Sequence, residues 1–210
     1  MQPAAGERVS PLRRAAAAGL LTGFLGVAAL SCWLAGIWPY AASSARIAMV
    51  PGAALAFVLA GTSLWLIARG PRAEQPSRTM LWTARACATV VAVLGLLPIV
   101  ELAAPATAPI AAIRMFLLSA LARRAPAPML DGIAAAGIVL AGGALLLASS
   151  ERWRRYAQWP ALAAALIGAL SLTRFIFNDE VTFTHLHFSL SASLGLLLLG
   201  AGILLSLIHI

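Results

Sequence analysis

The side chains that could do chemistry gather in two places, the first of which is the polar segment 178–187, Asn-Asp-Glu-Val-Thr-Phe-Thr-His-Leu-His. His185 and His187 would point the same way in an extended chain, with Asp179 and Glu180 close by. Imidazole and carboxylate groups can bind a metal ion, and histidine titrates at about pH 6.5, so the segment could also respond to acid. Two histidines without a fixed third ligand are a weak metal signal. A solvated periplasmic loop is therefore the preferred interpretation.

Glu101 and Arg174 form the second candidate pair, because both are expected at similar depth near the outer ends of apolar helices. A lone arginine well inside a bilayer costs about 2.5–3.5 kcal/mol on insertion scales, so an acidic partner would lower that cost. The preferred interpretation, however, is that each side chain reaches the outer interface separately, with its charged group in water.

No nucleophile–base pair, metal-ligand set or phosphate-binding glycine motif occurs in the sequence, so we expect no catalytic residue and no cofactor. Cys32 and Cys87 are expected at depths that differ by roughly 20 Å at the helical rise, which is beyond disulfide reach. No histidine and no acidic residue falls in the middle of an apolar run. This argues against a haem site and against an ion pump.

Composition sets the fold class. The 210 residues are 61% hydrophobic and 10% charged, with a mean hydropathy of +0.92, which excludes a water-soluble domain and predicts an all-α polytopic membrane helix bundle. About 20 apolar residues cross a hydrocarbon core about 30 Å thick. We expect a tail at 1–14 and a membrane domain at 15–204. Its six predicted spans are 15–37, 48–68, 83–104, 130–149, 158–177 and 188–205.

The distribution of arginine predicts the orientation and excludes nucleic acid as a partner. All basic residues are Arg, and they occupy short flanks between apolar runs, where the positive-inside rule places them. An N-terminus in the cytoplasm leaves ten arginines inside. The lipid bilayer is thus the expected partner, and Lys-free, Ala-rich composition indicates a bacterial inner membrane. The five outer arginines would be Arg46, Arg114, Arg123, Arg124 and Arg174.

One kind of helix occurs three times, each time after a short non-helical collar. Spaced copies of one helix predict a repeated helix-pair unit, and these copies run in the same direction, unlike the inverted repeats of many transporters. In the partner helices Gly95 aligns with Gly168, and the same offset places Glu101 opposite Arg174. The copies are the segments 49–61, 130–142 and 188–200.

Several local signals accompany these helices. Pro98 lies inside the third span and should kink it, and Asp131 is well placed to cap the fourth. The segment 113–124 is too short to span and suits an amphipathic helix on the outer surface. Small residues favour close helix packing in the first and fifth spans, at Gly19-x-x-x-Gly23 and Ala164-x-x-x-Gly168.

The segment Met49-Val50-Pro51-Gly52-Ala53-Ala54-Leu55-Ala56-Phe57-Val58-Leu59-Ala60-Gly61 resembles a helix of the form M-x-P-N-T-A-L-x-F-L-L-L-G. That helix recurs in the N-terminal membrane regions of bacterial sensor histidine kinases and some diguanylate cyclases, and 188–200 resembles its last copy. Gly52 and Ala53 replace the Asn-Thr of the pattern. The resemblance implies cytoplasmic PAS and output domains and homodimers formed through them. It transfers no catalytic residue, because no phosphoacceptor histidine, ATP-binding glycine box or GGDEF motif is present.

The last six residues, 205–210, read Leu-Ser-Leu-Ile-His-Ile, which resembles a translation of a transposase adapter used in sequencing libraries. The sixth span also lacks the Arg and Trp residues that end the second and fourth spans. We therefore expect a non-native end at 205–210 on a fragment of a longer protein, with no function for His209. The alternative is an ordinary apolar helix end.

Together these features predict the membrane-embedded sensory and anchoring module of a bacterial signal-transduction protein, with its cytoplasmic output domain missing. The alternative is a free-standing small polytopic membrane protein, either transporter-like or a subunit of a complex.

Overall fold

The computed structural model describes residues 5–35, 49–69, 78–103, 132–177 and 189–207, and within these ranges the regular elements are all helical. The α2, α5 and α7 helices begin at equivalent positions of the repeat, and the described residues before α2 and α7 (Met49, Val50 and Ser189) are not helical, as predicted for two of the collars. The elements are α1 (Ala5–Leu34), α2 (Pro51–Arg69), α3 (Arg78–Ala103), α5 (Gly132–Ala148), the 3₁₀ turn η2 (Arg154–Ala157), α6 (Gln158–Phe177) and α7 (Leu190–Leu207).

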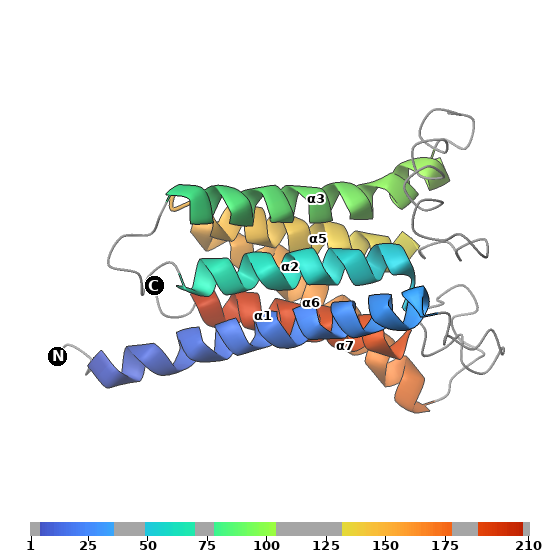
Figure 1. Ribbon diagram of the computed structural model, residues 1–210, viewed down its shortest axis with the longest axis horizontal. Helices are drawn as coiled ribbons and strands as arrows, with labels where there is room; N and C mark the ends of the chain where they lie inside the picture. The colour runs from blue at the N-terminus through green and yellow to red at the C-terminus, as the bar shows by residue number, and fades with distance from the viewer. Residues whose placement is uncertain (1–4, 36–48, 70–77, 104–131, 178–188, 208–210) are drawn as a thin grey trace.

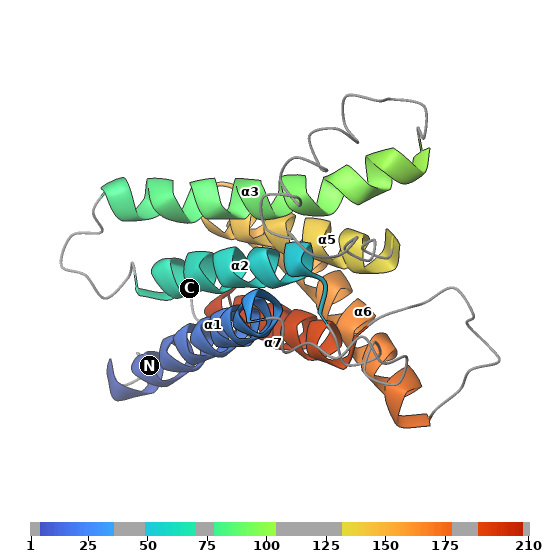
Figure 2. The same cartoon turned by 45° about the vertical axis from the view of Figure 1, so that its right-hand side comes forward.

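Two helices begin earlier than the sequence predicts. The α1 helix begins at Ala5, inside the segment expected as a tail, and includes Pro11 within its first turns. The α3 helix begins at Arg78 and contains Pro98, as predicted. Its last turns leave the direction of the rest of the helix in Figure 2, as expected where proline removes a backbone N–H and crowds the preceding turn.

Large apolar side chains cover much of the outside of the bundle, whereas many of the buried residues are small. Phe24 of α1 and Leu166 of α6 are 69% and 57% exposed, whereas the buried face of α2 consists largely of alanine, glycine and serine. Water would favour the opposite arrangement, but lipid does not penalise exposed leucine or phenylalanine. The chain is thus an all-α polytopic membrane helix bundle. Four of its described helices are long and apolar enough to cross a membrane: Pro11–Leu34, Pro51–Arg69, Arg78–Val100 and Leu190–Leu207.

The helices pack as three antiparallel pairs: α1 with α2 (the first pair), α3 with α5 (the second) and α6 with α7 (the third). These pairs make the most extensive contacts in the bundle. Adjacent pairs meet through α2 and α3, α5 and α6, and α7 and α1, so the pairs close into a ring (Figure 1). The α2, α5 and α7 helices also contact one another and run in the same direction. The predicted parallel repeat is therefore confirmed, with its repeated helices at the centre.

One glycine on each of α1, α3 and α6, the helices that surround the centre, shows that the three pairs share one geometry. Gly95 of α3 lies so close to α5 that a Cβ added to it would be 2.9 Å from the Ala135 carbonyl oxygen and 2.8 Å from the Val139 nitrogen. Gly168 of α6, which the sequence aligns with Gly95, has the same relation to α7, and so does Gly26 of α1 to α2. The corresponding distances are 2.9 Å to Ser193 O and 2.8 Å to Leu197 N for Gly168, and 2.6 Å to Ala54 O and 2.8 Å to Val58 N for Gly26.

The helices at the centre of the bundle, α2, α5 and α7 (the inner helices), also have a glycine at each pair contact. This glycine lies three residues after the residue whose nitrogen is approached in the contact above. A Cβ on Gly142 would lie 2.7 Å from the Ala92 nitrogen, and one on Gly200 would lie 2.9 Å from the Ala161 carbonyl oxygen. Gly61 lies against the carbonyl oxygen of Gly19 and the nitrogen of Gly23. The predicted packing face at Gly19-x-x-x-Gly23 is thus confirmed as the seam of the first pair.

Candidate functional site: the central seam and the arginine end

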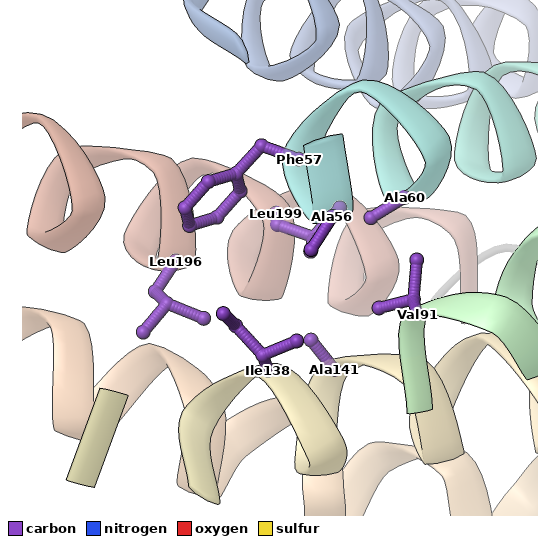
Figure 3. A pocket seen from close by; sticks show the side chains of 8 residues that line it. All are labelled: Ala56, Phe57, Ala60, Val91, Ile138, Ala141, Leu196 and Leu199. Atoms are coloured by element: carbon purple, nitrogen blue, oxygen red, sulfur yellow. The ribbon is translucent and has the colours of Figure 1, made fainter. Parts of the chain in front are cut away.

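The three inner helices, α2, α5 and α7, contact one another along the axis of the bundle, here called the central seam. Gly137 of α5 faces Leu196 of α7, and Gly195 of α7 faces Phe57 of α2, with added Cβ atoms 2.7 and 2.8 Å from the respective side chains. In both contacts a glycine of one inner helix faces a large side chain of the next. If the same contact occurred a third time, between α2 and α5, it would place α2 against Ile138 of α5. Figure 3 shows the side chains of Phe57, Ile138 and Leu196 around one space, as the threefold arrangement requires.

The central seam is dry and apolar. Its lining has no room for a water-sized molecule, and every lining side chain is a hydrocarbon. In this conformation the seam therefore holds the helices together and offers no binding site for a polar ligand. The lining residues are Ala56, Phe57, Ala60, Val91, Ile138, Ala141, Leu196 and Leu199 (Figure 3).

Four of the five buried polar side chains in the described bundle, all except Ser189, are hydroxyls that donate to backbone carbonyls. Thr22 donates to the Ala18 carbonyl of its own helix at 2.8 Å, which satisfies the hydroxyl without linking helices. Ser63 of α2 donates across the boundary between the first and second pairs, to the Ala84 carbonyl of α3 at 2.9 Å. The Ser63 bond is the kind of polar contact that fixes one helix against another in lipid.

Arginine and exposed aromatic side chains mark one end of the bundle, where α2 and α5 end and α3 and α6 begin. Arg69 lies over the Trp65 ring at 4.1 Å and Arg152 over the Trp153 ring at 5.6 Å. Trp159 is also largely exposed. Aromatic rings beside arginine are typical of a membrane–water interface, so this end, here called the arginine end, lies at a membrane surface.

Arg85 joins the two helices of the second pair at the arginine end. Its Nη2 donates to the Ser149 carbonyl at 3.0 Å, and its Nε donates to the Ser149 hydroxyl at 3.3 Å. The Ser149 hydroxyl in turn donates to the Leu146 carbonyl at 2.7 Å. A cation is favoured at the C-terminal end of α5, where carbonyl groups lack helical partners. Sequence reasoning placed Arg85 at this interface but missed its partner, which lies on another helix.

The predicted site residues are only partly described. Pro98 lies within α3, while Glu101 and Arg174 lie near the ends of α3 and α6, and their side chains are outside the described part. The α5 helix lies between α3 and α6 in the ring, and the C-terminal ends of α3 and α6 lie apart in Figure 2. Pairing of Glu101 with Arg174 stays a prediction, which a double-mutant cycle with alanine at both positions would test, since additive losses would reject it.

The remaining candidates lie outside the described residues. These are the capping residue Asp131, the proposed surface helix 113–124 and the metal or acid-sensing candidates Asp179, Glu180, His185 and His187. Within the described ranges, no group of three or more His, Cys, Asp or Glu side chains could hold a metal ion. Cys32 and Cys87 are both free thiols, as expected.

The repeat offers one indirect check on the predicted cap. Ser189 stands directly before α7, at the position that Asp131 occupies before α5 in the sequence repeat. The Ser189 hydroxyl accepts a hydrogen bond from the Ala192 nitrogen at 3.2 Å, which is the N-capping geometry. The prediction for Asp131 therefore has a described counterpart in the third pair.

No protein-family model, curated protein or solved structure matches the chain. The geometry of the bundle is therefore the basis for any proposal about function.

Proposed function

We propose that the chain is the membrane-embedded sensory and anchoring module of a bacterial signal-transduction protein. The observation that carries the proposal is the position of α7, which packs against α6, α1 and both other inner helices and ends at the arginine end. A displacement of any pair would reach α7 through these contacts. The resemblance of the repeated helix to those of sensor histidine kinases and diguanylate cyclases supports the same proposal.

The orientation in this proposal follows from charge. The arginine end faces the cytoplasm of a bacterial inner membrane, with the N-terminus inside, because arginine accumulates on the cytoplasmic side. The α7 helix would then deliver the packing change to a cytoplasmic kinase or cyclase domain, through which the protein would form homodimers. The stimulus would act at the outer segments or within the bilayer.

The alternative proposal is a free-standing small membrane protein. A transporter needs a polar site near the middle of the membrane, and the central seam in this conformation is apolar and dry. The exposed apolar faces of α1, α3 and α6 could be covered by lipid or by another protein, so they are equally consistent with a subunit of a larger complex. The sensory module is favoured because α7 integrates contacts from the whole ring.

A reporter fusion tests the sensory proposal. A histidine-kinase catalytic domain is joined after α7 as a continuous helix, and its autophosphorylation is measured in vesicles. The test variant is Phe57→Ala, which alters the central seam. The control is Gly143→Ala, whose added Cβ meets nothing within 4 Å. We expect the seam variant to change the phosphorylation rate severalfold and the control to leave it unchanged. A reporter that ignores every change in the bundle would count against a sensory role.

The gene itself offers an independent test of the output. A long sequencing read of the native gene past the codon for Leu205 would show whether the frame continues into a PAS, kinase or cyclase domain. A continuing frame would name the output. A natural stop would favour the free-standing membrane protein.

A further inference from the structure

The connection between α5 and α6 is a short, hydrogen-bonded turn that holds three arginines together, the basic turn, residues 149–157. The Ser150 nitrogen donates to Leu147 O at 3.1 Å, the Trp153 nitrogen to Ser150 O at 3.2 Å and the Tyr156 nitrogen to Trp153 O at 3.0 Å. The segment contains three arginines and one acidic residue, so the turn carries a net positive charge. Its charged residues are Glu151, Arg152, Arg154 and Arg155.

The charge on the basic turn is poorly compensated within the described chain. Arg154 is half-buried, and its Nε is buried without a hydrogen-bond partner among the described residues. Burial lowers the pKa of Arg154, and the nearby carboxylate of Glu151 offsets only part of that effect. Within 149–157 three arginines stand against one glutamate, and this uncompensated positive charge favours an anion beside the turn.

The basic turn lies at the depth of lipid headgroups. The rings of Trp153 and Tyr156 are about half exposed, and Trp159 is 66% exposed, at the start of α6. Tryptophan and tyrosine rings concentrate where hydrocarbon meets headgroups, which is also where lipid phosphates lie. Arg152 and Arg155 are exposed beside these rings and are therefore within reach of a phosphate.

We propose that the basic turn binds the phosphate of an anionic bilayer lipid, with Arg152 and Arg155 as the contacting side chains and Arg154 as a supporting charge. The planar guanidinium matches two phosphate oxygens at once, and the acyl chains would lie along the apolar outer face of α6, where Leu162, Leu166 and Leu170 are exposed. Arg85 of α3, which contacts the start of this turn, is engaged with Ser149. This proposal does not depend on a sensory role.

Lipid binding to the purified full chain in detergent tests the proposal. Native mass spectrometry would compare retention of phosphatidylglycerol with that of phosphatidylcholine carrying the same acyl chains. We expect the wild type to retain phosphatidylglycerol preferentially and R152Q/R155Q to bind it less by about fivefold for each arginine removed. The matched control is R13Q/R14Q, which removes two exposed arginines from α1 and should leave the preference unchanged.

Four results would contradict the proposal. Equal losses in R152Q/R155Q and R13Q/R14Q would indicate diffuse surface charge, and equal retention of the two lipids by the wild type would indicate no site. Displacement of phosphatidylglycerol by millimolar inorganic phosphate would indicate a site for soluble anions. R152K/R155K keeps both positive charges, so it separates loss of the guanidinium group from loss of charge or of the fold. It should bind severalfold more weakly than the wild type, and full retention would reject guanidinium recognition.

Discussion

Contacts within the helix pairs differ in kind from contacts between them. Within each pair, the close approaches at glycine include backbone atoms, as where Gly95 lies against Ala135 and Val139. Between pairs, the closest approaches at glycine are to side chains. An added Cβ on Gly195 would meet the ring of Phe57, and one on Gly202 would lie 2.7 Å from the Leu64 methyl group and 2.8 Å from the Ala18 Cβ. A backbone cannot give way, whereas a side chain can change rotamer. The pairs are therefore rigid units, and the junctions between them are the adjustable part of the bundle.

The largest effect is expected at a backbone seam. Gly61→Ala would place a methyl group against the Gly19 carbonyl oxygen and the Gly23 nitrogen, and neither can move without separating α1 from α2. We expect a loss of about 3 kcal/mol in the free energy of unfolding, measured by detergent-induced denaturation. Gly143→Ala is the control, since its Cβ has open space and alanine favours a helix. Equal stability of the two variants would remove the distinction between seams and junctions.

A smaller loss is expected at the central seam, where side chains can repack. Phe57→Ala removes a ring that is 1% exposed. Phe→Ala costs about 3–5 kcal/mol in water-soluble cores, but lipid is as apolar as the seam, so only the cavity term remains and we expect a cost of about 2 kcal/mol. Phe24→Ala is the matched control, because Phe24 faces lipid and its removal leaves no cavity. Thermal denaturation in micelles compares the two. A cost at Phe57 larger than at Gly61 would reverse the order of rigidity.

The link at the arginine end should rank third. Arg85→Ala removes both hydrogen bonds to Ser149 and the cation at the end of α5, and we expect a loss of about 1 kcal/mol. Exposed Arg78 on the same helix serves as the control through Arg78→Ala, which should leave stability nearly unchanged. The effect of Arg85→Ala should persist in high salt, since the partner is a carbonyl group.

The smallest effect is expected for the hydrogen bond between the first and second pairs. Ser63→Ala removes the bond to Ala84 and should cost about 0.6 kcal/mol, the average for such bonds in a membrane bundle. Thr62→Val alters a neighbouring hydroxyl that bonds only within α2, to Val58, and should cost less. Hydrogen exchange at α3 amides would show whether loss of the Ser63 bond loosens the junction with α2.

The sequence predicts the all-α membrane bundle, the positions of its helices and the repeat. The reason is that the collars and the Gly95–Gly168 alignment depend on spacing along the chain. Gly26, the third member of that set, could not be predicted, because the residues around it share little identity with the other copies. The Ala164-x-x-x-Gly168 face was also predicted, and Gly168 packs on α7 as expected.

The sequence did not predict which helices lie at the centre or which residues meet across helices. An amphipathic helix shows its buried face through periodicity, but α5 is apolar on every side, so no face can be distinguished. The bonds from Arg85 to Ser149 and from Ser63 to Ala84 join different helices and leave no mark in local spacing. Of the proposed site residues, His185, His187 and Asp131 lie outside the described ranges.

Closure of the ring has a consequence for biogenesis. A pair whose seam is made from its own two consecutive helices can assemble as soon as both have left the translocon. The contact between α7 and α1 is different, because Ala18, which lies against Gly202, is synthesised long before α7 and is separated from it in the chain by the other described helices. Until α7 is inserted, that surface of α1 must be covered by lipid or by an insertion factor.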